Sequence, residues 1–128
     1  MSVEASDFWS RATQALQTTK DLIASDPDAA ASRAYYAAFY AISALFALEG
    51  KTFSRHSALE VALHRDYIKT GQWSIERGKE FTFLLNLRST GDYGGEMHVS
   101  QAEAEEALTA ADHILQSVHQ RYPEQFPL

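Results

Sequence analysis

The chain has 128 residues, a formal net charge of −6, 45% apolar residues and no cysteine. This length suits one domain with an apolar core. The acidic balance argues against indiscriminate binding to nucleic acid, which depends on many contacts between phosphates and Lys or Arg. The absence of cysteine excludes disulfides and thiolate chemistry.

Nothing in the sequence predicts export or insertion into a membrane. The first ten residues, MSVEASDFWS, lack the basic and apolar regions of a secretory signal. The longest apolar run, residues 34–48, is shorter than the roughly 20 residues that a bilayer span needs. We therefore expect a cytoplasmic protein.

The first half of the chain predicts two helices, because its apolar residues recur at three- and four-residue spacing. The first covers residues 7–24 and ends at the sequence SDPD, since proline disfavours the helical conformation in the residue before it. The second covers residues 27–49, with Pro27 in its first turn and Gly50 just past its end. This second helix is apolar on almost every side, which predicts a central position in a bundle.

Three more helices are expected, over residues 54–70, 74–90 and 101–122. Gly71 and Gly91 mark the ends of the first two, and a capping box of Ser100 and Glu103 begins the last. No segment alternates with the strand period, and short connections favour antiparallel neighbours. The sequence predicts an all-α fold, a single up-and-down bundle of about five helices, as one domain over residues 1–128 with its core over 7–122.

Charge is unevenly distributed along the chain. Residues 51–79 carry six Lys or Arg residues against three acidic ones, whereas residues 80–128 carry two against eight. A local basic face could therefore exist on an acidic protein. The alternative is that these charges form ordinary solvated helix surfaces.

The sequence contains no motif of a phosphate-binding loop, a dinucleotide-binding loop or a zinc protease. His113 and His119 are six residues apart, a spacing that does not bring them together on one helix face. His64 is expected at the surface of its helix. We therefore predict no metal site and no cofactor.

Arg88 stands where the fourth predicted helix should bury an apolar side chain. It follows Phe81, Leu84 and Leu85 at i, i+3, i+4 and i+7, so it continues the apolar stripe. Asp92 would lie beside it if the helix lasts one more turn. Because an unpaired buried guanidinium is costly, Arg88 needs either a partner, as in a buried salt bridge, or a functional cleft.

The second predicted helix carries polar groups that could reach the same region. Arg33, Tyr36 and Tyr40 lie at i, i+3 and i+7 on one seam of that helix. The alternative is that Arg33 pairs with a nearby acidic residue and that the tyrosines are core residues whose hydroxyls are satisfied.

At this point the sequence resembles a known family. The segments SRAYYAAFYAISALFALEGKTFSRHSAL, YIKTGQW, LRSTGDYG and VSQAEAEEALTAADHI together are similar to the HEPN domain family, over residues 7–122. The similarity is greatest to small stand-alone members with RAYYA on one helix and R-x-x-x-D-Y-G at the end of another. The resemblance implies a dimerising helical bundle that commonly accompanies a minimal nucleotidyltransferase, as toxin and antitoxin or in another defence arrangement.

The resemblance also implies a candidate site. Active HEPN members are metal-independent ribonucleases with an Arg, four to six residues and then a His, and two copies meet in a cleft across the dimer. Arg88 corresponds to that Arg, and Tyr93 occupies the position of the His. Tyr, with a pKa near ~10, is a poor base at neutral pH. The resulting candidates are Arg88, Asp92 and Tyr93 for catalysis, and Arg33, Tyr36 and His98 for substrate binding.

Three functions remain open from the sequence. The chain is a metal-independent ribonuclease toxin paired with a nucleotidyltransferase, or a non-catalytic dimeric module that binds nucleotide or RNA or is modified by such a partner, or a purely structural dimer. We expect His56 to cap a helix rather than to join the cleft. Phe83 and Leu87 are expected at the surface, where they would support dimerisation.

Overall fold

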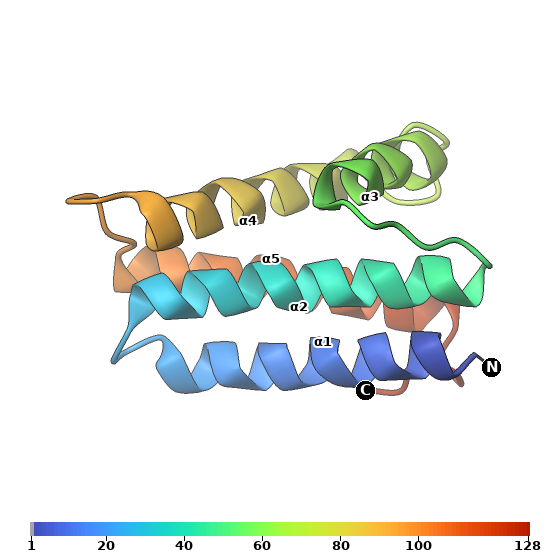
Figure 1. Ribbon diagram of the computed structural model, residues 1–128, viewed down its shortest axis with the longest axis horizontal. Coiled ribbons are helices and arrows are strands. Elements are labelled where there is room, and N and C mark those ends of the chain that lie inside the picture. Colours follow the sequence, from blue (N-terminus) through green and yellow to red (C-terminus); the bar gives the residue numbers. More distant parts are fainter. Residues whose placement is uncertain (1) are drawn as a thin grey trace.

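The computed structural model describes residues 2–128, in which every element of regular secondary structure is helical (Figure 1). The helices are α1 (Val3–Leu22), α2 (Pro27–Leu48), α3 (His56–Leu63), a π-helical segment η1 (His64–Ile68), α4 (Ile75–Tyr93) and α5 (Gln101–Arg121). The expected all-α bundle is thus confirmed. Within residues 2–128, no helix combines the length and the apolar character that crossing a bilayer requires.

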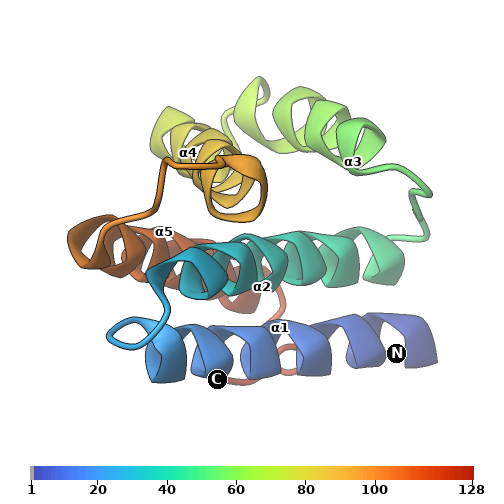
Figure 2. The ribbon, with the colours of Figure 1, turned by 60° about the vertical axis from the view of Figure 1, so that its left-hand side comes forward.

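Helix α2 is the centre of the bundle and packs against α1, α4 and α5 (Figures 1 and 2). Many of its buried residues are alanines, among them Ala34, Ala37, Ala38 and Ala41, each 0% exposed. Small side chains at a helix contact permit short distances between helix axes. The predicted central position of this helix is therefore confirmed, and its alanines explain how three helices fit around it.

Local signals mark both ends of α2 and the start of α5 where the sequence predicts them. The carboxylate of Asp26 accepts a hydrogen bond from Ala29 N, and Pro27 occupies the first turn of α2. Gly50 follows α2 with a φ of +83°, a conformation that favours glycine. The reciprocal bonds of the capping box join Ser100 and Glu103 at the start of α5. These contacts satisfy amides that have no partner inside a helix.

The region expected as one helix over 54–70 is instead a short α-helix continued by a π-helical turn. An inserted residue of this kind changes the direction in which later side chains point. Here Tyr67 is 2% exposed and donates its hydroxyl hydrogen to the Glu49 carboxylate at 2.7 Å. The side chain of Tyr67, within the π-helical turn, is thus directed into the core.

Helix α4 continues past Gly91 to Tyr93, so the expected helix stop at Gly91 is wrong. A Cβ atom on Gly91 would lie 2.7 Å from the backbone oxygen of Asp28, closer than real contacts allow. Glycine is needed here because α4 approaches the start of α2, and not because the helix ends. Leu87, expected at the surface, is 7% exposed, and Phe83 is half-buried.

We predict that Gly91→Ala destabilises the protein by about 1–3 kcal/mol, since the new methyl group forces α4 away from α2. Glycine to alanine inside a helix otherwise stabilises by roughly 0.5–1 kcal/mol. Urea unfolding measures the change, and Ser89→Ala, at an exposed position two residues earlier, is the control. A stability equal to or above that of the unaltered protein would contradict the close approach.

Candidate functional site

Arg88 lies near the end of α4 and is surrounded by tyrosine rings. Its guanidinium carbon is 5.2 Å from the ring centre of Tyr36, 5.4 Å from that of Tyr35 and 5.9 Å from that of Tyr93. Nη2 donates a hydrogen bond to the Tyr36 hydroxyl at 3.1 Å. Its side chain is only 20% exposed, so the stripe that predicted burial of Arg88 is largely confirmed.

Asp92 completes the surroundings of Arg88. Because α4 lasts the extra turn, Nε of Arg88 donates to Oδ2 of Asp92 at 3.0 Å, and the Ser32 hydroxyl donates to the same oxygen at 3.4 Å. Within residues 2–128, Nη1 of Arg88 and Oδ1 of Asp92 have no hydrogen-bond partner. The pair is thus fixed in place by α2 and retains one donor nitrogen and one acceptor oxygen for a ligand.

His56 belongs to the same cluster and does not cap α3. Its Nδ1 lies 2.9 Å from the Tyr35 hydroxyl, and its ring stacks on Phe39 with 4.0 Å between ring centres. The N-cap residue of α3 is Arg55, which makes no side-chain capping bond. The expectation that His56 is a capping group is therefore wrong: the loop after α2 carries His56 back over the aromatic face of that helix.

The protonation of His56 follows from its neighbours. Burial, together with the nearby charge of Arg88, lowers the pKa of His56 below its usual value, so the ring is neutral at neutral pH. Burial raises the pKa of Tyr35 to about 12, against the opposing effect of Arg88, so Tyr35 keeps its proton. The Tyr35 hydroxyl has no other acceptor within residues 2–128, and it therefore donates to Nδ1. This assignment places the imidazole proton of His56 on Nε2.

Arg33 adds a second guanidinium beside Tyr36. Its guanidinium carbon lies 4.9 Å from the Tyr36 ring centre. Within residues 2–128, Arg33 forms no salt bridge, so it does not pair with an acidic residue as one interpretation of the sequence proposed. Tyr36 is thus in contact with both Arg33 and Arg88, and the two cations mark one basic edge of the α2–α4 surface.

His98 and Tyr93 occupy different positions relative to this cluster. His98 pairs with Asp28 at 2.7 Å and is 70% exposed, while the backbone N of Val99 donates to the other Asp28 oxygen at 2.7 Å. These two hydrogen bonds, that of Val99 first, lower the pKa of Asp28. His98 therefore fastens the loop after α4 to the start of α2 and makes no bond to Arg88. Tyr93 is 75% exposed, with its ring beside Arg88.

Within residues 2–128, no three His, Asp or Glu side chains come close enough together to hold a metal ion. His113 bonds to Glu80 of α4, whereas His119 bonds to the backbone oxygen of Phe126, so the two histidines have separate partners. The cluster around Arg88 itself consists of a guanidinium, a carboxylate, phenols and an imidazole.

Comparison with known proteins identifies the fold family. Residues 5–122 match the family model described as the HEPN domain. The chain belongs to the HEPN domain family. It is 32% identical over 114 residues to a UPF0332 protein of Thermotoga maritima, covering 88% of this chain and 86% of the relative. It is also 29% identical over 99 residues to "Putative toxin MJ0142" of Methanocaldococcus jannaschii, covering 77% of this chain and 67% of that protein.

In the tyrosine cluster, the imidazole and the guanidinium come from different helices, α3 and α4. The position after four intervening residues from Arg88 holds Tyr93. The histidine that shares the tyrosine cluster with Arg88 is His56, from the start of α3. Sequence reasoning gave His56 a different role because helix periodicity cannot place a residue that follows a loop. The sequence contains one sign of the observed position of His56, the aromatic residues Tyr35, Tyr36 and Phe39 on one helix, against which another aromatic ring can pack.

We predict that Arg88→Met raises the pKa of His56, since it removes the cation that disfavours imidazolium. NMR titration of the imidazole protons measures this, with Arg65→Met, on an exposed part of η1, as the control. Because the folded pKa lies below the unfolded value of 6.5, His56 also makes folding less favourable as the pH falls through that value. An unchanged His56 titration in Arg88→Met would show that the two groups do not interact.

Proposed function

We propose that this HEPN protein is a toxin-like, metal-independent endoribonuclease. The observation that carries the proposal is the arrangement of Arg88, whose Nε and Nη2 are held by Asp92 and Tyr36 while Nη1 has no partner within residues 2–128. A guanidinium fixed in this way, next to the neutral imidazole of His56, suits a phosphate whose charge increases during reaction. The relative from Methanocaldococcus jannaschii that bears the name of a toxin supports the biological class.

The proposed reaction is attack of an RNA 2′-oxygen on the neighbouring phosphorus. The new bond joins the 2′-oxygen to phosphorus, and the bond from phosphorus to the 5′-oxygen breaks. Arg88 stabilises the negative charge of the phosphorane. Oδ1 of Asp92, the oxygen not bound to Arg88, accepts the proton of the 2′-hydroxyl. Nε2–H of the neutral His56 donates a hydrogen bond to a phosphate oxygen, and the departing 5′-oxygen takes its proton from water. The carboxyl group of Asp92 returns its proton to water afterwards.

Arg33 and Tyr93 suit the binding of the RNA around this reaction. Arg33 sits over Tyr36 without a carboxylate partner within residues 2–128 and is available to an adjacent phosphate. The 75% exposed ring of Tyr93 offers a surface on which an unpaired base stacks. This assignment favours single-stranded RNA, because bases in a duplex are not free to stack on a side chain.

We also infer a homodimer, formed over the aromatic face of α2, and a minimal nucleotidyltransferase as the second partner. Tyr36, Phe39 and Tyr40 remain only partly buried, although they lie on the most buried helix of the bundle. Phe8 of α1 extends this face by stacking on Tyr40 at 6.4 Å. Leu87 is buried within the monomer and does not contribute to such a surface.

The ribonuclease proposal predicts that the purified protein cleaves RNA in the presence of EDTA and that Arg88→Ala lowers the rate by about 100-fold or more. His56→Ala also lowers the rate, and Arg88→Lys does not restore it, because an ammonium lacks the planar fork of a guanidinium. Tyr93→Phe keeps the stacking ring and therefore most of the activity. Cleavage products of a tRNA mixture are measured on gels.

The control for this experiment is Arg65→Ala, which removes an exposed guanidinium outside the cluster. Circular dichroism and melting temperatures establish that each variant is folded. If Arg88→Ala cleaves RNA as fast as the unaltered protein, Arg88 is not catalytic and any activity in the preparation belongs to another site or another protein.

The dimer proposal predicts twice the chain mass in sedimentation equilibrium at micromolar concentration. Tyr40→Lys weakens association, since it places a charge in the aromatic face. Val61→Lys, at a 62% exposed position on α3, leaves association unchanged and is the matched control. A monomer at these concentrations, or equal effects of both variants, would exclude this interface.

The exposure of Tyr93 favours one alternative, a non-catalytic HEPN module modified by its nucleotidyltransferase partner. The hydroxyl of Tyr93 makes no hydrogen bond within residues 2–128, and its ring lies beside Arg88, which could attract a nucleotide phosphate. Transfer of a nucleotide to Tyr93, without RNA cleavage by the unmodified protein, would support the alternative. Loss of transfer in Tyr93→Phe would identify the acceptor.

A further inference from the structure

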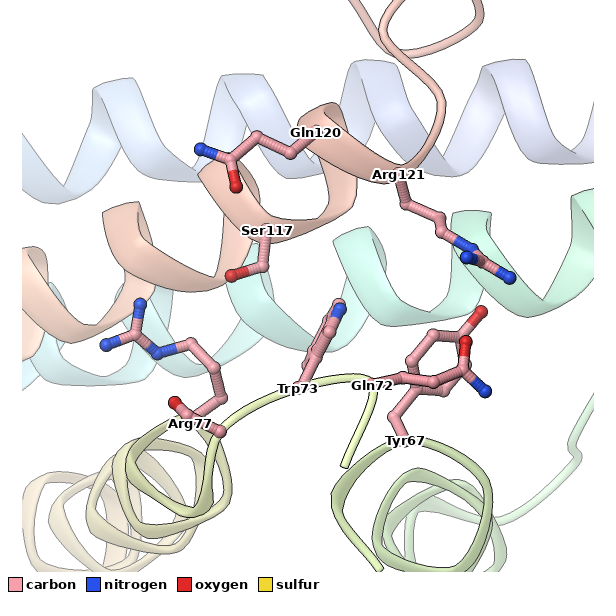
Figure 3. Close-up of a pocket in the computed structure, with 8 residues that line it drawn as sticks. Tyr67, Gln72, Trp73, Arg77, Ser117, Gln120 and Arg121 are labelled. Carbon is pink, nitrogen blue, oxygen red and sulfur yellow. The ribbon is translucent and has the colours of Figure 1, made fainter. Parts of the chain in front are cut away.

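A polar cavity of about 350 Å³ lies at the start of α4, away from the cluster around Arg88 (Figure 3). Its walls come from η1, the segment between η1 and α4, the first turn of α4 and the last turns of α5. Arg77 precedes Arg88 by eleven residues on α4, which corresponds to about 16 Å along the helix. The cavity is therefore separate from the candidate site, and none of its residues belongs to the segments that match the HEPN arginine motif.

Two guanidinium groups line the cavity, and no Asp or Glu does. Arg77 pairs with Glu80 through Nε, and its Nη2 lies 3.5 Å from Nδ1 of His113, so Nη1 is its terminal nitrogen without a partner within residues 2–128. Arg121 has no carboxylate within salt-bridge distance among residues 2–128. The two arginines extend from different helices toward opposite ends of the cavity, with Trp73 between them (Figure 3).

Neutral polar groups complete the lining. The indole nitrogen of Trp73 has no hydrogen-bond partner within residues 2–128, and it is directed toward α5 (Figure 3). Gln72 uses its side-chain nitrogen on the backbone oxygen of Asp66, so its side-chain oxygen remains free. Ser117 and Gln120 add a hydroxyl and an amide from α5. Trp73 is 8% exposed and Tyr67 is 2% exposed, so these rings form walls rather than open stacking surfaces.

We propose that this cavity binds a phosphate monoester about the size of a mononucleotide, with the phosphate at Arg121 and the other end near Arg77. Planar guanidinium groups recognise phosphate oxygens through paired hydrogen bonds. A volume of about 350 Å³ lies at the lower end of the range for small-molecule sites, roughly 300–1,000 Å³. The unpaired donors of Trp73 and Gln120 suit the hydroxyl and ring acceptors of such a ligand. An apolar ligand would leave the guanidinium of Arg121 without a charged partner.

Tryptophan fluorescence provides a direct test, because the chain has two tryptophans and only Trp73 lines the cavity. In a Trp9→Phe background, adenosine 5′-monophosphate is expected to change the Trp73 emission in a saturable way. Inorganic phosphate should bind more weakly, and adenosine should produce no saturable change. Calorimetry on the unaltered protein should rank the three ligands in the same order of affinity, which would show that Trp9→Phe does not alter binding.

Variants assign the binding to the cavity. Arg121→Gln is expected to weaken binding of the monophosphate by about tenfold or more, since it removes a charged donor to the phosphate. Arg77→Gln should also weaken it, with a melting curve to establish that the loss of the Glu80 pair has not unfolded the protein. Lys20→Gln, an exposed charge at the far end of α1, is the matched control and should bind normally.

Arg88→Ala separates this inference from the proposed ribonuclease activity, because it should abolish cleavage and leave monophosphate binding unchanged. The inference is overturned if neither fluorescence nor calorimetry detects the monophosphate, if adenosine binds equally well, or if Arg121→Gln binds as tightly as the unaltered protein. It is also overturned if Arg88→Ala abolishes binding, since the ligand would then occupy the cluster around Arg88.

Discussion

The contact between the end of α4 and the first turns of α2 determines the geometry of the candidate site. Three α2 residues at four-residue spacing, Asp28, Ser32 and Tyr36, face α4 and the loop after it. Gly91 packs against the backbone of Asp28, Ser32 bonds to Asp92, and Tyr36 bonds to Arg88. Residues four apart lie on one helix face, so a single stripe of α2 positions the whole end of α4. A shift of α4 would therefore separate Arg88 from its phenol and from the adjoining imidazole together.

Sequence reasoning succeeded where a structural feature depends on neighbouring residues in the chain. Pro27 and Gly50 predict the ends of α2, and Ser100 with Glu103 predicts the start of α5, because these signals involve groups a few residues apart. The apolar stripe ending in Arg88 also predicts that this guanidinium would be largely buried and would need a partner. The position of Asp92 was conditional on one more helical turn, which the structure has.

The sequence could not show features that depend on contacts between distant segments. Gly91 has the same local signature whether it stops a helix or allows another helix to approach, and only the position of Asp28 distinguishes the two. The π-helical turn contains Tyr67, whose hydroxyl bonds to Glu49, 18 residues away. His56 reaches Tyr35 only because the loop after α2 returns over that helix. In each case a long-range contact overrides the local pattern.

An acidic net charge is compatible with phosphate chemistry when the acidic residues act as supports for arginines. Asp92 holds Arg88 through Nε, and Glu80 holds Arg77 through the same nitrogen. Each carboxylate thus orients a guanidinium whose Nη1 has no partner within residues 2–128. Much of the remaining negative charge lies on exposed positions of α5, such as Glu105 and Glu106. The net charge of the chain therefore does not predict the local charge of the cavity at the start of α4 or of the cluster around Arg88. A carboxylate that binds Nε of an arginine fixes the orientation of the guanidinium and lowers the positive potential at its terminal nitrogens only modestly. A carboxylate bound to the terminal nitrogens would instead occupy the place of the phosphate.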